Sequence, residues 1–304
     1  MLKRSGTKGS EPSRAGMKGA TASRAGMSLV EVLVALSLGA IVLAVAASSM
    51  LRQQRGVRWI EGLSAAELQV RPVSSALPDE LSQLDASAGD IAPGEASDSS
   101  LQLRAVVAAS LSCDSAAALT LLPDTASAPA MVGGMSAPAV GDSVWFYLGS
   151  PLGWRARTVT GVARTTTACG VPTSAAAPTF RLLLDAPAGV SAGTPVRVTR
   201  WERWVVYRAS DGRWYVGIRD YSPATSRFLS AQPVAGPFLR SVRGGARTGF
   251  RYFDASGSPL DPDGTNEGRI ARVRITTLSV VPATGADTVR RDSTDAVLSR
   301  SDVP

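Results

Sequence analysis

Few residues in this chain could do chemistry, and no histidine is among them. Without histidine there is no Ser-His-Asp or Cys-His pair, no imidazole metal ligand and no usual proton shuttle near neutral pH. Glu202 and Asp220 are two carboxylates of one segment, but nothing in the sequence indicates that they converge. Because no other catalytic motif occurs, we predict that the protein is not an enzyme.

One run of oxygen-bearing side chains could serve a hard cation. Residues 261–267 include Asp261, Asp263, Asn266 and Glu267, and calcium prefers oxygen ligands of this kind. The run lacks the spacing of an EF-hand loop, and a polar hairpin loop explains it equally well. Calcium is therefore an alternative here, and no other cofactor or metal is predicted.

Aromatic and basic side chains gather in a second segment. Its members are Trp201, Trp204, Tyr207, Trp214 and Tyr215 with Arg200, Arg203 and Arg213. The favoured interpretation is a strand core whose arginines bury their apolar stems and keep their charges in water. The alternative is a stacking surface for single-stranded DNA, as in uptake filaments.

The chain has two cysteines, Cys113 and Cys169. An even pair suits a disulfide in an oxidising compartment such as the periplasm. Two unpaired buried thiols are the alternative, and two cysteines alone do not make a zinc site.

The carboxylate with the strongest functional signal is Glu31. It lies at the start of an apolar segment in which no charge occurs from Val32 to Leu51, a run of 20 residues. At about 1.5 Å per residue, a helix of this length crosses the hydrocarbon core of a bilayer. A carboxylate costs roughly 2.5–3.5 kcal/mol at the centre of a membrane, and less near its surface, so a functional role is expected.

A basic leader precedes the apolar segment. Residues 1–26 carry six Lys or Arg residues and one Glu, a net charge of +5, which leaves +2 of the total +7 for residues 27–304. The positive-inside rule then predicts a cytoplasmic N-terminus and translocation of the bulk of the chain. Because residues 27–304 are nearly neutral, the total charge does not indicate a general nucleic-acid binder.

The order of these parts is unusual for an export signal. An ordinary secretory signal has its small-residue cleavage site after the apolar region, whereas here Ala25-Gly26 comes before it. The stretch Arg24-Ala25-Gly26-Met27-Ser28-Leu29-Val30-Glu31 and the apolar run after it resemble the N-terminal signal of type IV prepilins and type II secretion pseudopilins. In that family the first mature residue is usually Phe, and Met27 departs from this pattern.

The resemblance implies several roles for these residues. Prepilin peptidase would cleave between Gly26 and Met27 and methylate the new N-terminus. Glu31 would be the fifth residue of the mature chain and would act in filament assembly. A near-repeat at residues 13–17 lacks the apolar helix after it, so only the second copy is expected to be cleaved. Met17 is an alternative start of the chain.

The remaining pattern predicts an α+β fold, in which a long N-terminal hydrophobic helix carries an antiparallel β-rich head. We expect a cleaved leader at 1–26, a transmembrane and stalk helix at 27–70 and a periplasmic head at 71–304. Pro72 is expected to end or kink the helix, and a short second helix is expected over Pro78–Asp85. Residues 86–100 and 123–141, rich in Ala, Ser, Gly and Pro, are expected to be loops. The predicted strands are Leu101–Val107, Ala118–Leu122, Ser143–Leu148, Arg155–Val162, Phe180–Leu184, Pro195–Arg208, Trp214–Arg219, Phe238–Val242, Gly249–Phe253 and Arg269–Val281.

Short motifs in the predicted head extend the resemblance. Val140–Phe146 is similar to a strand entry of PilW-type minor pilins. Tyr252–Gly257 followed by Ile270–Ile275 resembles the closing hairpin of PilW-type and GspJ-type subunits. The resemblance implies a minor pilin or pseudopilin that assembles into a filament, or primes its assembly.

That function implies particular partners and places. The partners would be other pilin or pseudopilin subunits, prepilin peptidase and the inner-membrane assembly platform. The chain would cross the bacterial inner membrane once, with a periplasmic head, and then enter a periplasmic or cell-surface filament. The alternatives are a membrane-anchored periplasmic binding module and an anchored hydrolase.

Overall fold

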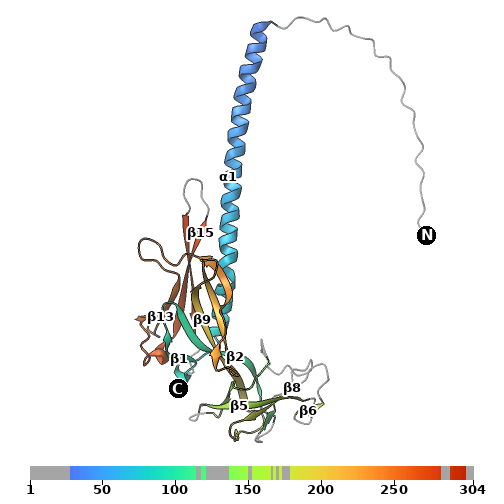
Figure 1. The fold of residues 1–304 in the computed structure, drawn as a ribbon, viewed down its shortest axis with the longest axis vertical. Coiled ribbons are helices and arrows are strands. Elements are labelled where there is room, and N and C mark those ends of the chain that lie inside the picture. The colour runs from blue at the N-terminus through green and yellow to red at the C-terminus, as the bar shows by residue number, and fades with distance from the viewer. Residues whose placement is uncertain are drawn as a thin grey trace, which may run out of the picture. The chain divides into compact units, whose positions relative to one another are not determined.

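The computed structural model describes residues 28–113, 118–120, 137–149, 153–165, 167–168, 171–172, 179–281 and 288–298. They form one long apolar helix followed by antiparallel strands (Figure 1), which confirms the predicted α+β class. The chain divides into two compact units, of which the first ends at Arg55 and the second starts at Gly56.

The helix α1 spans Leu29–Leu81 without interruption. The prediction that it ends near Val70, with a separate helix over Pro78–Asp85, is wrong because α1 continues through Pro72 and Pro78. A proline inside a helix removes one backbone hydrogen bond and costs about 3 kcal/mol. Some other contribution must therefore stabilise these turns.

Packing supplies that contribution. One stripe of α1 is buried in the second unit, and its members are Ala66, Val70, Val73, Leu77 and Leu81. Each fully buried Val or Leu side chain stabilises the folded state by about 1.5–3 kcal/mol. The stripe therefore outweighs the local preference of the two prolines.

A ten-stranded antiparallel sheet forms most of the second unit. The strand β9 organises it, because one edge of β9 pairs with β2 while its other edge pairs first with β4 and then with β10. The order is β1-β2-β9-β4-β5-β8-β3, and β12 and β11 pair with β10. The strands are β1 (Ile91–Ala96), β2 (Ser100–Leu111), β3 (Ala118–Thr120), β4 (Ser143–Tyr147), β5 (Trp154–Thr165), β8 (Thr179–Leu184), β9 (Pro195–Arg208), β10 (Trp214–Ser222), β11 (Arg227–Phe228) and β12 (Gln232–Phe238).

A second, four-stranded antiparallel sheet has the order β14-β13-β15-β16. Its strands are β13 (Gly249–Phe253), β14 (Pro259–Leu260), β15 (Arg272–Val281) and β16 (Thr288–Val297). A two-stranded ribbon pairs β6 (Thr167–Ala168) with β7 (Val171–Pro172), and single 3-10 turns lie at η1 (Ala86–Ala88) and η2 (Glu267–Arg269).

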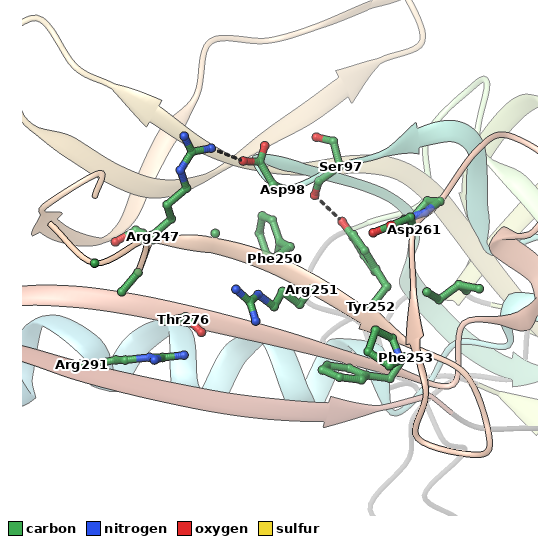
Figure 2. A pocket seen from close by; sticks show the side chains of 18 residues that line it. Ser97, Asp98, Arg247, Phe250, Arg251, Tyr252, Phe253, Asp261, Thr276 and Arg291 are labelled. Carbon is green, nitrogen blue, oxygen red and sulfur yellow. Dashed lines mark hydrogen bonds and ion pairs between the residues drawn. The ribbon is translucent and has the colours of Figure 1, made fainter. Parts of the chain in front are cut away.

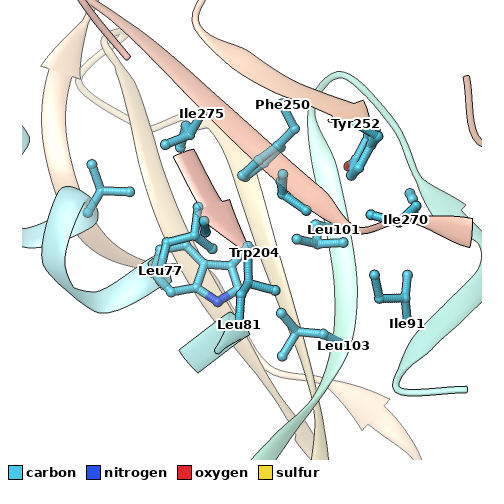
Figure 3. Packing of buried hydrophobic residues seen from close by; sticks show 14 of the residues in the cluster. Leu77, Leu81, Ile91, Leu101, Leu103, Trp204, Phe250, Tyr252, Ile270 and Ile275 are labelled. Carbon is cyan, nitrogen blue, oxygen red and sulfur yellow. The ribbon is translucent and has the colours of Figure 1, made fainter. Parts of the chain in front are cut away.

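The main core lies where the last turns of α1 meet both sheets (Figure 3). Leu77 and Leu81 pack with Trp204 of β9, Leu101 of β2 and Ile275 of β15. A smaller apolar cluster lies among β2, β4, β5, β8 and β9 and includes Phe146 and Val198. The end of the stalk helix is therefore a structural part of the head.

The predicted strands match the structure where the apolar pattern is strong. Pro195–Arg208 and Gly249–Phe253 have the predicted bounds. The predicted strand Phe238–Val242 is wrong, because β12 ends at Phe238. The loop predicted at 86–100 contains β1, and residues 123–136 of the second predicted loop lie outside the described residues.

Several strands escaped prediction, and two of them, β1 and β16, are edge strands with a poor apolar pattern. β1 contains Pro93 and Gly94, and an edge strand tolerates a proline because one side of its backbone needs no partner. β16 is a run of mostly charged and hydroxyl residues that pairs with β15 alone.

Candidate functional site

The first turn of α1 is built around Ser28 and Glu31. The backbone carbonyl of Ser28 accepts a hydrogen bond from the N–H of Val32 at 3.2 Å, and its hydroxyl accepts one from the N–H of Glu31 at 3.3 Å. Ser28 is thus the N-cap, and Glu31 occupies the third helical position, the spacing of a capping box. A carboxylate in this turn also faces the positive end of the helix dipole.

The helix is exposed on every side from Leu29 to Glu61. Leucine and valine side chains there are mostly uncovered, and Leu29, for example, is 78% exposed. The most apolar 18-residue stretch of α1 has a mean hydropathy of 2.6, so by length and composition the helix could cross a membrane. A helix that is apolar all round and uncovered by its own chain needs lipid or other helices around it.

Charged side chains reappear directly after the charge-free run that ends at Leu51. Arg52, Arg55 and Arg58 follow the charge-free run, and Trp59 stands beside them, 48% exposed. Basic and aromatic residues of this kind are typical of the boundary between a bilayer and water.

Residues 21–47 match the prokaryotic N-terminal methylation motif. The motif indicates a type IV pilin-like precursor that is processed by prepilin peptidase, and it belongs to structural rather than catalytic proteins. Together with the apolar helix it fits a membrane-anchored pilin. No curated protein and no solved structure matches this chain.

The match contains every residue to which the N-terminal signal assigns a role. Gly26 and Met27 lie inside it but outside the described residues, whereas Glu31 lies inside it and on the exposed first turn of α1. Cleavage after Gly26 would leave Met27 as the residue directly before the N-cap.

The predicted disulfide involves a residue without a described position. Cys113 directly follows Ser112, whose hydroxyl donates to the carbonyl of Ser191 at 2.6 Å, and this contact fixes the chain after β2. Cys169 lies outside the described residues, so its pairing with Cys113 stays a prediction.

The acidic loop of residues 261–267 forms hydrogen bonds within the protein. Glu267 is buried, and its Oε1 accepts from the backbone N–H of Gly94 at 2.9 Å and of Gly264 at 2.7 Å. Asp263 accepts from the N–H and hydroxyl of Thr265, and the Asn266 amide donates to the carbonyl of Asp261. In the described part of the chain no three Asp, Glu, His or Cys side chains are placed for a metal ion. Calcium binding by this loop stays a prediction.

The aromatic and basic cluster is divided between the two faces of the sheet. Trp204 is fully buried in the main core, whereas Trp201 lies on the opposite face under the Arg104 guanidinium, 4.1 Å from its ring centre. Arg200 and Arg203 are engaged in ion pairs, the first with Asp142 at 2.7 Å and the second with Glu95 at 2.7 Å. The charges of these two arginines are therefore paired with carboxylates of the protein itself.

Sequence reasoning missed one acidic site inside the head. Glu202 and Asp220 lie directly opposite each other on β9 and β10, which corrects the expectation that nothing brings them together. Glu80, in the last turn of α1, joins them, and its Oε2 accepts from the Trp204 indole N–H at 2.8 Å. The chain separation of Glu80 from the strands explains why no local pattern shows the site.

The two glutamates of this site are held away from their ordinary protonation state. Burial raises the pKa of Glu202 to about 9, with smaller contributions from the charges of Glu80 and Asp220. Burial likewise raises the pKa of Glu80 to about 7, although the Trp204 indole opposes the shift. Between about pH 7 and pH 9 a protonated Glu202 donates a hydrogen bond to the Glu80 carboxylate, and the pair shares one proton.

Proposed function

We propose that this chain is a minor pilin-like subunit that is cleaved after Gly26, methylated at Met27 and assembled into a filament. The filament is a type IV pilus or a type II secretion pseudopilus, and the subunit either joins it or primes its assembly. The observation that carries the proposal is the methylation motif at residues 21–47, which runs into a helix with exposed apolar side chains. Among pilin classes, the short motifs of the head favour the PilW and GspJ types.

The exposed helix supplies the assembly surface. In the membrane, lipid covers the apolar side chains from Leu29 to Leu51, and in a filament the helices of neighbouring subunits replace the lipid. This packing of helices requires no catalytic group.

Glu31 supplies the specific contact. Its carboxylate pairs with the N-terminal ammonium of Met27 on a neighbouring subunit, which offsets the cost of removing both charges from water. The Ser28 hydroxyl holds the backbone N–H of Glu31 in the first turn, so the start of the carboxylate side chain has a fixed position along the helix axis, and pairing with it would set the axial position of the neighbour.

The size of the head favours a minor role. The chain is larger than a typical major pilin, and a bulky head packs poorly at every position of a filament. We infer use in few copies, at the tip or at initiation.

The basic leader and the motif support a proposed location of the subunit in the cell. It crosses the inner membrane once, with a cytoplasmic N-terminus and a periplasmic head, until the assembly platform moves it into the filament. Prepilin peptidase and other pilin subunits are its partners.

Processing is the decisive test, and the chain supplies its own control. Gly26→Val should abolish cleavage, because the bulky side chain replaces the small residue at the cut. Gly16→Val, in the near-repeat at residues 13–17, should leave cleavage unchanged. The intact mass of the membrane-extracted protein reports both results. A wild-type protein that keeps residues 1–26 would contradict the proposal and support a membrane-anchored periplasmic binding module instead.

A further inference from the structure

The head contains a pocket of about 640 Å³ to which the proposed function assigns no role (Figure 2). It lies beside β13, between the turn that joins β1 to β2 and the segment that joins β12 to β13. Asp98 belongs to the first of these segments and Arg247 to the second. The four-stranded sheet contributes side chains from β13, β15 and β16.

Three polar side chains of the pocket share one face of that sheet. Arg251 of β13 is opposite Arg274, and Arg291 of β16 is opposite Leu278. Thr276 lies on β15 between Arg274 and Leu278, two residues from each, so its side chain points to the same face. Both arginines are therefore diagonal neighbours of Thr276, at about 7–8 Å between backbones, and Figure 2 shows the three together.

The two arginines lack the counter-charges that their neighbours have. Arg274 donates to Asp295 at 2.6 Å. Among the described residues, no carboxylate lies within ion-pair distance of Arg251 or Arg291. The lack of counter-charge is greatest at Arg251, because this residue lies directly opposite Arg274. Two like charges in such a pair destabilise a sheet.

The carboxylates of the pocket do not relieve this charge. Asp98 accepts from Arg240 at 3.1 Å and lies 3.6 Å from Arg247, so it is already shared by two guanidinium groups. Asp261 is seen in Figure 2 on the far side of Tyr252 from Arg251. The part of the pocket around Thr276 therefore carries excess positive charge.

An apolar wall adjoins the charged part. Phe253 of β13 forms this wall on the same face as Arg251, and Pro259 and Pro262 line the pocket beside it. The guanidinium groups of Arg272 and Arg274 lie 4.3 and 5.2 Å from the centre of the Phe253 ring, so a ligand packs on the part of the ring that they leave open. A ligand here meets two guanidinium groups and a hydroxyl at one end and an aromatic ring at the other.

We propose that this pocket binds an organic oxyanion, a carboxylate or a phosphate ester, whose charged group lies between Arg251 and Arg291. The two guanidinium groups donate to its oxygens, since planar arginine groups match carboxylate and phosphate geometry. The Thr276 hydroxyl donates or accepts at the floor of the pocket, and the apolar part of the ligand packs on Phe253. The inference does not depend on filament assembly.

Calorimetric titration of the full chain in a nonionic detergent tests the proposal. The probes are benzoate, phenyl phosphate and inorganic phosphate, and the tighter of the two aromatic probes identifies the oxyanion. We expect saturable binding of at least one aromatic probe. Inorganic phosphate should bind at least tenfold more weakly than phenyl phosphate, because it lacks the apolar part.

Variants on two different strands locate the site. Arg251→Gln and Arg291→Gln should each weaken binding at least tenfold, because each removes a charged donor. Arg213→Gln is the matched control: it removes the same charge from the exposed turn between β9 and β10 and should change the Kd less than twofold. Failure of both aromatic probes to bind would overturn the proposal. Equal weakening by all three variants would also overturn it, since that result indicates attraction to the net charge alone.

Discussion

Replacing Glu202 by glutamine should make the head more stable at alkaline pH and leave it unchanged in acid. The glutamate is held protonated by burial, with its pKa raised from 4.5 to about 9, whereas the unfolded chain releases the proton near pH 4.5. The folded state therefore binds more protons, and its stability falls as the pH rises from 4.5 to 9. A Glu202→Gln side chain still donates to the Glu80 carboxylate but needs no proton to do so.

The magnitude follows from linkage. One excess proton in the folded state changes the free energy of unfolding by about 1.4 kcal/mol per pH unit. Between pH 5 and pH 8, Glu202 thus accounts for a loss of about 4 kcal/mol in the wild-type protein. Glu80, whose pKa is raised to about 7, adds a loss in the same direction that ends near pH 7. The Glu202→Gln variant should keep only the pH-dependent loss of stability that belongs to Glu80.

Urea unfolding of the full chain in a nonionic detergent, followed by tryptophan fluorescence at pH 5 and pH 8, measures this effect. Five of the six tryptophans belong to the head, and Trp204 lies in its core beside Glu80, so the emission reports unfolding of the head. Glu67→Gln, which changes an exposed glutamate of the same helix, is the matched control and should leave the pH dependence intact. Equal pH dependence in wild type and Glu202→Gln would show that no shared proton exists at this site, and the reasoning would be wrong.

Three further predictions concern the helix and the disulfide. Glu31→Gln should be processed and inserted normally yet enter filaments poorly, because the amide keeps the capping spacing of the first turn but cannot neutralise the ammonium of Met27. The amount of this subunit in sheared filaments, divided by the amount in the membrane, measures the effect. An unchanged ratio would rule out the charge pair. Cys113 and Cys169 should both resist alkylation in exported, non-reduced protein, as judged by intact mass, whereas ready labelling of both thiols would exclude the disulfide. Leu77→Ala should destabilise the head by about 2–5 kcal/mol, because it leaves a cavity between the helix and both sheets; urea unfolding tests this, and a loss below 1 kcal/mol would mean that the helix end is not part of the core.

The sequence was most informative where the chain itself imposes a local pattern. The first part of α1 follows from the uninterrupted apolar run after the basic leader, and β9 follows from alternating apolar and polar residues. The pattern failed at Pro72, because tertiary packing stabilises helical turns that the local sequence disfavours. It failed again at β1 and β16, since an edge strand needs neither a continuous apolar face nor a complete set of backbone donors.

The interior acidic site could not be predicted for a different reason. Glu80 meets Glu202 and Trp204 only through long-range packing, and the separation of Glu80 from Trp204 is 124 residues. The same holds for Arg251 and Arg291, which lie on different strands with β15 between them. Local spacing carries no information on which strands become neighbours, so chemistry that is assembled across a sheet stays hidden until the pairing is known.

The burial of the last turns of α1 also sets the order in which the head can fold. A ribosome completes Leu77 and Leu81 long before Ile275, yet these three side chains belong to one core. Until β15 has been made, the apolar stripe at the end of α1 is only partly covered, by residues of β2 and β9. The head is thus a late-folding body with contacts between distant parts of the chain, which slows folding. A newly made subunit accordingly passes through a stage in which chaperones, or premature association with another chain, compete with its own last strands for that stripe.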